Sequence, residues 1–425
     1  MLKTHPKALA FIFFTEMWER IGFYTLLAIL VLYMDKILGW PDARKGDYYG
    51  LFLALCYFVP LLGGYIGDRW LGRRNTVKIG ASLMALGYVG LAVSSASQTA
   101  TFYLGLFFVG VGTGIFKVNM SVLVGNLYVD KPHLKDAGFN IFYMGVNVGA
   151  TIAPLLATFV SVVLGSYNIS FWICAAGLIA ALVIFQAGNR ALASADFKAV
   201  PKPSTSAGLA AAVDRSEDRQ RVATLFILFF IVIFFWVAFY QNGFALTLFA
   251  ERSTKIFTWL RPETYQFFEP FFILVLTPPL LAYFGLLNRG GKEPSTPVKI
   301  FLGMLIMAVS MIVMVLASLA GGDKDVNIMS PAWLIGTYFI FTLAEILISP
   351  MGLSFVSKVA PPRLAGLMMG GWFAATAFGS YGSGLLGRFY GDFAHHQYFL
   401  MLTGLLGVST LLVLGFLKKL KRFAG

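Results

Sequence analysis

Twelve long apolar runs, separated by short polar breaks, dominate this sequence of 425 residues. A helix needs about 20 apolar residues to cross a bilayer, and every run is long enough to do so. We therefore expect an all-α membrane protein with twelve transmembrane helices. The runs cover residues 8–35, 47–67, 76–96, 101–128, 137–163, 169–188, 222–250, 265–287, 298–320, 331–356, 364–390 and 396–417.

The composition excludes a soluble globular protein. Hydrophobic residues make up 58% of the chain and charged residues only 12%, against about 45–50% and about 25% in soluble domains. The two cysteines, Cys56 and Cys174, lie inside apolar runs, so neither a disulfide framework nor a metal site is expected. The first run is too long for a cleavable signal sequence, and we interpret it as a permanent helix.

One long polar segment, residues 189–221, separates the sixth run from the seventh. It divides the chain into an N-terminal six-helix bundle (1–188), a linker (189–221) and a C-terminal six-helix bundle (222–425). The loop Gly64–Arg74 after the second run forms a weak internal repeat with Asn288–Lys292, which stands at the corresponding place after the eighth run. Two such halves resemble the major facilitator superfamily, whose carriers bind substrate near the bilayer midplane between the halves.

The basic residues predict the orientation. If the termini, the linker and the even-numbered connections share one side, that side holds 23 of the 33 Lys and Arg residues and the other side holds 8. By the positive-inside rule, both termini and the linker are then cytoplasmic in the plasma (inner) membrane. The formal charge of +13 needs no nucleic acid, because anionic lipid headgroups suffice as partners. A monomer is expected.

A few charged residues lie at membrane depth, where a charge costs at least about 2.5–3.5 kcal/mol and is a functional hypothesis by default. Two basic residues, Arg20 and Lys117, lie inside helices. The acidic candidates are Glu16, Glu19 and Glu345, with Glu269 nearer to the start of its run.

In the first helix, Glu16, Glu19, Arg20 and Tyr24 are spaced along one face. Two carboxylates beside one guanidinium leave one acid without a counter-charge. A carboxylate that is partly removed from water binds a proton more readily. The cluster is therefore a candidate protonation switch, and the alternative is a static salt bridge that holds the halves together.

Lys117 lies deep in the fourth run and needs a carboxylate from the protein or from a substrate. The glycines around it do not form a phosphate loop, because no strand precedes them and the run is transmembrane. They favour close helix packing instead. Polar stripes at helical spacing in later runs include Asn147, Glu345, Ser349 and Trp372, and the alternative reading is interhelical contacts worth about 0.6 kcal/mol each.

The sequence contains no metal-ligand set, no pairing of nucleophile and base, and no nucleotide fingerprint in a soluble segment. We therefore expect neither an enzyme nor an ATP-driven pump, and no cofactor other than a proton as coupling ion.

Several of these segments resemble one family, the proton-dependent oligopeptide transporters of the major facilitator superfamily. The first helix is similar to its E-x-x-E-R-F-x-Y-Y signature. The fourth, fifth, tenth and eleventh helices carry further matches, which together cover nearly the whole chain. The matching segments are Glu16–Tyr24, Gly114–Asn119, Phe139–Ala150, Glu345–Ser354 and Met368–Phe373.

The resemblance implies roles for these residues. Proton coupling would involve the cluster on the first helix and the lysine of the fourth helix: Glu16, Glu19, Arg20 and Lys117. Lys117 would also face the carboxylate of a peptide, and Glu345, helped by Ser349, would hold its amino group. The remaining residues of the substrate pocket would be Tyr24, Tyr57, Asn147, Tyr240 and Trp372.

Two positions depart from the family pattern. Peptide carriers usually have an arginine where this chain has Leu27, and a glutamate before Gln241 where this chain has Tyr240. Compared with the family pattern, the pocket thus lacks one cation and one acid, so its net charge is the same as in that pattern.

The leading hypothesis is a symporter that imports di- and tripeptides with protons by alternating access. The alternative is a divergent carrier of the same fold that moves another small amine or carboxylate, including as an exporter. A third hypothesis is a membrane receptor that transports nothing.

Overall fold

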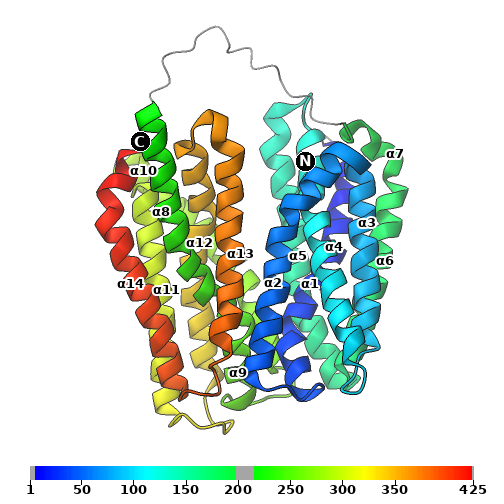
Figure 1. The fold of residues 1–425 in the computed structure, drawn as a ribbon, viewed down its shortest axis with the longest axis vertical. Coiled ribbons are helices and arrows are strands. Elements are labelled where there is room, and N and C mark those ends of the chain that lie inside the picture. The colour runs from blue at the N-terminus through cyan, green and yellow to red at the C-terminus, as the bar shows by residue number, and fades with distance from the viewer. Residues whose placement is uncertain (1–4, 198–214, 424–425) are drawn as a thin grey trace.

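The computed structural model describes residues 5–197 and 215–423. Within these residues, twelve helices of 20 residues or more form two groups that stand side by side (Figure 1). The N-terminal group consists of α1 (Ala8–Lys36), α2 (Asp42–Ile66), α3 (Arg73–Ala92), α4 (Thr99–Asn126), α5 (Lys135–Val163) and α6 (Tyr167–Ala187). The π-helical turn η2 (Gly67–Leu71) continues α2, and η3 (Pro132–Leu134) precedes α5.

The C-terminal group contains the other six long helices. They are α8 (Arg215–Phe239), α10 (Phe268–Arg289), α11 (Thr296–Ala320), α12 (Pro331–Val359), α13 (Ala365–Gly387) and α14 (His395–Arg422). Shorter elements connect them, namely η5 (Tyr240–Gly243), α9 (Ala245–Arg252), η6 (Pro262–Phe267) and η7 (Pro362–Leu364). The start of α1 and the end of α14 lie at the same end of the molecule, which we call the inner end (Figure 1).

The all-helical membrane architecture expected from the sequence is confirmed. Ten helical segments of the described chain are long and apolar enough to cross a membrane. The two long helices outside this set are α3, which begins with Arg73 and Arg74, and α13, which is rich in glycine and serine. Each packs closely against neighbouring helices, α3 against α4 and α6, and α13 against α2 and α8.

Most of the expected linker lies outside the described residues. Its first residues form α7 (Asn189–Leu192) and η4 (Ala193–Ala195). Asp196 accepts a hydrogen bond of 2.8 Å from the Arg74 Nε atom, so this stretch is attached to α3. At the other side of the segment α8 already begins at Arg215, before the expected start at residue 222. The domain boundaries themselves stay a prediction.

The expected run over residues 222–250 lies in one candidate membrane span, Glu217–Arg252, but the helix is not continuous, because η5 separates α8 from α9. The buried Gln241 side chain explains the break: its Nε2 donates to the Ser383 carbonyl at 3.0 Å, and its Oε1 accepts from the Tyr398 hydroxyl at 3.0 Å. Gly243 is needed in this turn, since a Cβ there would collide with the hydroxyl of Tyr49 on α2. The break thus fits the C-terminal group against the N-terminal group.

The two groups touch where glycines remove side chains from the interface. Gly50 of α2 faces α13 so closely that a Cβ would lie 2.8 Å from the Tyr381 carbonyl oxygen and 3.0 Å from the Gly384 Cα. A second contact joins α5 to η6, where the hydroxyls of Thr158 and Thr264 are 2.7 Å apart. These contacts bring helices of both groups within bonding distance of each other.

Ionic contacts between the groups gather at the outer end, opposite the chain termini. Arg252 at the end of α9 donates to Asp42 at 2.8 Å and to Asp35 at 3.2 Å. Lys45, which is buried, pairs with the same two carboxylates. We call these four residues, Asp35, Asp42, Lys45 and Arg252, the outer ionic cluster. It ties α1 and α2 to α9.

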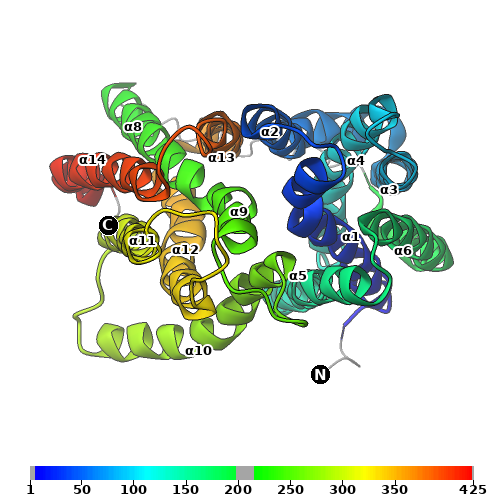
Figure 2. The same cartoon turned by 90° about the horizontal axis from the view of Figure 1, so that it is seen from below.

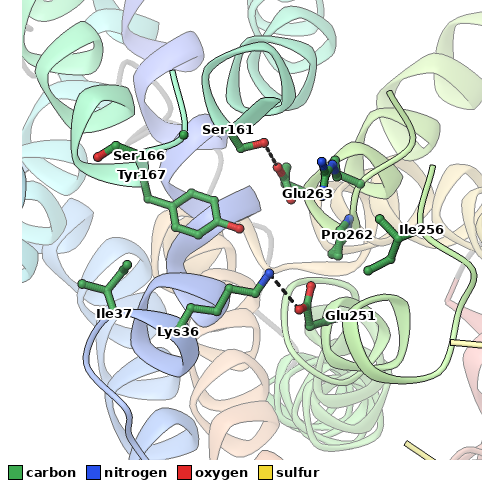
Figure 3. Close-up of a pocket in the computed structure, with 11 residues that line it drawn as sticks. Lys36, Ile37, Ser161, Ser166, Tyr167, Glu251, Ile256, Pro262 and Glu263 are labelled. Carbon is green, nitrogen blue, oxygen red and sulfur yellow. Dashed lines mark hydrogen bonds and ion pairs between the residues drawn. The ribbon is translucent and has the colours of Figure 1, made fainter. Parts of the chain in front are cut away.

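A cavity of about 290 Å³ lies beside the outer ionic cluster (Figure 3). Two bonds cross it from one group to the other. Lys36 pairs with Glu251 at 2.7 Å, and the Ser161 hydroxyl donates to the carboxylate of Glu263, which is almost fully buried (Figure 3). The outer end is therefore closed by contacts from both groups.

Candidate functional site

The charged cluster on α1 is an ion triad inside the protein. The Arg20 Nε atom lies 3.1 Å from Glu16 Oε1 and 2.5 Å from Glu19 Oε2, and none of the three side chains is more than 2% exposed. The other oxygen of Glu16 is buried without a hydrogen-bond partner in the described part of the chain. Burying a charge without a partner is costly. With both acids ionised, the triad carries one negative charge more than its guanidinium balances.

A close approach of α5 to α1 keeps this triad from water. A Cβ on Gly149 would lie 2.7 Å from the Arg20 Cβ and 2.7 Å from the Met17 carbonyl oxygen. The half-buried Asn147 lies two residues earlier on the same helix. Small residues at such a contact let two membrane helices pack backbone to backbone. Because residues two apart on a helix do not share a face, Asn147 lies on a different face of α5 from Gly149.

Lys117 faces the triad from α4 and has no carboxylate within ion-pair distance among residues 5–197 and 215–423. Its Nζ lies 5.7 Å from the centre of the Tyr57 ring. It lies within electrostatic reach of Glu16 and Glu19 on α1. Its side chain is nevertheless exposed. An exposed ammonium group without a carboxylate partner is available to bind an anion.

Two polar side chains of α12, Glu345 and Ser349, belong to the candidate site on the side of the C-terminal group. Glu345 Oε2 and Ser349 Oγ are both buried and have no hydrogen-bond partner in the described residues. They lie four residues apart, one helical turn, and so occupy the same face of α12. Trp372 of α13 is buried against the next turn, where a Cβ on Gly352 would collide with its indole ring.

Tyrosines lie near the charged residues of the N-terminal group and near the polar residues of α12. The rings of Tyr57 on α2 and Tyr240 at the break after α8 lie 5.6 Å apart. Tyr24, one turn after Arg20, is half-buried, and the charges of Arg20, Glu269 and Glu345 all act on it. It therefore lies within electrostatic reach both of Arg20 in its own group and of two acids of the C-terminal group. We call this whole arrangement the central site.

The structure thus places the sequence-predicted residues in two facing sets. Those of the N-terminal group are Glu16, Glu19, Arg20, Tyr24, Tyr57, Lys117 and Asn147, and those of the C-terminal group are Tyr240, Glu345, Ser349 and Trp372. Their individual roles in binding and proton coupling stay predictions. The outer ionic cluster is not evident from the sequence, because its members stand near helix ends, where charged residues are ordinary. The same holds for Glu263, which lies in the first turn of the short 3-10 helix η6.

Comparison with known proteins decides the family. The family model described as POT family matches residues 74–205 and 197–401. A peptide transporter of Yersinia enterocolitica, YePEPT, is 31% identical over 90% of this chain and 88% of its own length. The chain belongs to the POT family. A dipeptide and tripeptide permease A of Escherichia coli is another relative, 28% identical over 90% of this chain and 83% of its own length.

Solved POT structures share the whole fold. The crystal structure of a peptide transporter POT in complex with sulfate superposes with a TM-score of 0.88, at 27% identity, over 99% of this chain and 96% of that one. A POT family transporter in complex with 5-aminolevulinic acid gives a TM-score of 0.86, at 27% identity, over 98% and 97%. This chain is therefore an integral membrane protein of a family of transporters.

Proposed function

We propose that this POT family member is a symporter that imports di- and tripeptides together with protons. One observation carries the proposal: in the described residues, Lys117 of the N-terminal group has no carboxylate partner, and Glu345 and Ser349 of the C-terminal group have no hydrogen-bond partner. A short peptide has a carboxylate at one end and an ammonium at the other. It satisfies both ends of the site at once.

Recognition of the peptide would follow from these contacts. Lys117 binds the carboxylate, and Glu345 binds the ammonium with the help of the Ser349 hydroxyl. Tyr24, Tyr57, Asn147, Tyr240 and Trp372 form the walls and contribute aromatic surface. Because each helix group supplies one end of the recognition, the peptide draws the two groups together. Relatives named as peptide transporters and as dipeptide and tripeptide permeases support this substrate class.

Proton coupling would use the ion triad. A proton on Glu16 or Glu19 removes the surplus negative charge and leaves one neutral ion pair with Arg20. The triad then no longer competes with the substrate carboxylate for Lys117, whose charge interacts with both acids. Substrate and proton thus favour each other's binding, which is the reciprocity that coupled transport requires.

Alternating access would use the contacts at the outer end. In the present state the outer ionic cluster and the bond between Ser161 and Glu263 hold that end closed. The exposed Lys117 is then reached from the inner end, where the chain termini lie. Import requires the opposite state, in which these bonds open and the inner end closes around the peptide and the proton.

We place the protein in the plasma (inner) membrane, with both termini in the cytoplasm, as a monomer whose basic inner surface contacts anionic lipid. The excess of Lys and Arg on that side supports this orientation. In this orientation the inner end of the present state opens to the cytoplasm. Peptide release, rather than uptake, is the step that this state serves.

A second candidate is a POT carrier for another small amine or carboxylate. A structural relative binds 5-aminolevulinic acid, which has an amine and a carboxylate but no peptide bond. Leu27 and Tyr240, which depart from the family pattern, change the surroundings of the carboxylate end.

A ligand screen on the purified protein separates the candidates. Thermal unfolding is measured with dialanine, trialanine, single amino acids and small organic anions. Stabilisation by the peptides above the rest supports the proposal, whereas stabilisation only by non-peptides supports the second candidate. Solute counterflow in proteoliposomes then tests transport itself, since a receptor binds a peptide but does not exchange it across the membrane.

A further inference from the structure

The C-terminal group contains a second carboxylate near the central site that the proposed function does not use. Glu269 stands in the first turn of α10 and is half-buried. Its Oε2 accepts a hydrogen bond of 2.6 Å from the side chain of Asn242, in the break between α8 and α9. Asn242 in turn accepts a bond of 3.3 Å from the Tyr338 hydroxyl through its carbonyl. Glu269 is therefore held by α12 through Tyr338, the residue two turns before Glu345.

Glu269 faces inward rather than toward lipid. Figure 2 shows α10 starting beside α5 and leading away to the edge of the molecule, so its first turn is the part nearest to the N-terminal group. The negative charge of Glu269 acts on Tyr24 and Tyr57, which line the central site, and on Glu345 itself. Glu345 acts on Tyr24 as well. Both acids thus lie within electrostatic reach of the same tyrosine.

No basic residue of the C-terminal group balances this pair at membrane depth. Neither Lys nor Arg occurs in the cores of four helices of this group, α8, α10, α12 and α13. These cores cover residues 222–239, 268–288, 331–357 and 365–387. Neither Glu269 nor Glu345 has a cation within ion-pair distance among the described residues. In the N-terminal group, by contrast, Arg20 and Lys117 balance Glu16 and Glu19. With every group ionised, the central site carries two negative charges.

We propose that Glu269 and Glu345 together form a two-carboxylate subsite that selects peptides with an additional positive charge, such as a lysine side chain. The inference rests on the proposed function, because it assigns a substrate class to the same site. A zwitterionic peptide brings no net charge and leaves both surplus charges in place. A peptide with a lysine side chain contributes one positive charge, and the transported proton contributes the second.

The occupied site is then neutral, which matters because uncompensated charges inside a membrane protein are costly. One carboxylate binds the terminal ammonium, and the other binds the ammonium of the side chain. A peptide with an acidic side chain places a third negative charge beside two existing ones. The order of affinity that follows is alanyl-lysine above dialanine above alanyl-glutamate.

Competition for uptake tests this order. Proteoliposomes take up radiolabelled dialanine, and the inhibition constants of unlabelled alanyl-lysine, dialanine and alanyl-glutamate are measured at one pH. For the unmodified protein, alanyl-lysine is expected to bind about tenfold more tightly than dialanine, as for other close charge pairs. In Glu269→Gln, which keeps an acceptor for Asn242, this ratio falls to about one. Glu269→Asp, which keeps the charge, retains the preference.

Glu263→Gln is the matched control. It neutralises a carboxylate six residues earlier, which lines the outer cavity instead of the central site (Figure 3). Because Glu263 belongs to the outer closure, its substitution shifts the inhibition constants of the peptides together, and the ratio between alanyl-lysine and dialanine is expected to stay unchanged. An unmodified protein that binds all three peptides alike, or a ratio that Glu269→Gln leaves unaltered, overturns the subsite and leaves the proposed function intact. If none of the peptides competes and none is taken up, both the subsite and the proposed function are wrong.

Discussion

Replacing Arg252 by glutamine is expected to shift the protein toward a state that is open at the outer end. Arg252 makes two ion pairs across the helix groups, with Asp42 and with Asp35, and its side chain is only 22% exposed. A partly buried pair of this kind contributes about 1 kcal/mol, somewhat more than an exposed one. Losing both pairs costs the closed state about 2 kcal/mol, which changes the ratio of the two states by about 30-fold.

Arg388 provides a matched control at the same interface. It pairs with Asp47 across α13 and α2 at 3.1 Å, but both side chains are almost half exposed, at 45% and 44%. Water and salt screen such a pair, so it contributes no more than about 0.5 kcal/mol. Arg388→Gln is therefore expected to change the ratio of states by about twofold at most.

Distances between spin labels measure the two states directly. Labels are attached at Gln98 and Asp392, two exposed residues of outer loops in different helix groups, after Cys56 and Cys174 have been replaced by serine. The population with a long distance should grow strongly in Arg252→Gln and hardly at all in the control. Equal effects of both substitutions, or no effect of either, would refute the reasoning that burial determines the strength of the outer closure.

Three further predictions concern single side chains. Gly352→Ala should displace the Trp372 indole and lower the affinity for dialanine by about tenfold. Gly366→Ala, at a position with free space for a Cβ, should leave this affinity unchanged. Binding of dialanine to the purified protein measures both effects. Glu16→Gln removes the surplus charge of the triad, so gradient-driven accumulation should disappear while counterflow of dialanine persists, and loss of both activities contradicts a coupling role. Ser161→Ala removes a donor from a buried carboxylate and should also populate the outward-open state, which the spin labels would detect; an unchanged distance distribution speaks against it.

Much of the fold could be predicted from the sequence, because transmembrane helices follow from apolar length alone. The first helix was expected over residues 8–35 and occupies Ala8–Lys36, and the ninth was expected over 298–320 and occupies Thr296–Ala320. The break at Tyr240–Gly243 was not expected, although the dipeptide Asn242-Gly243 is a turn signal. Apolar length outweighed that signal because the residues on both sides continue the hydrophobic run.

The candidate site could be predicted in part, because ionisable groups inside a membrane are rare and stand out. Glu16, Glu19 and Arg20 were expected to meet on one face, and the structure brings them into ion pairs. The outer ionic cluster could not be found in this way. Asp42 and Arg252 are 210 positions apart, and only the packing of α9 against α1 and α2 shows that they meet.

The central claim is that peptide and proton cross the membrane together, and uptake into proteoliposomes under an imposed gradient tests it most directly. With the outside acidic, labelled dialanine is expected to accumulate above its external concentration. Accumulation should vanish when a protonophore removes the gradient, and it should be absent in Lys117→Ala. Uptake that reaches only the external concentration, and does so equally with and without the gradient, would contradict the account.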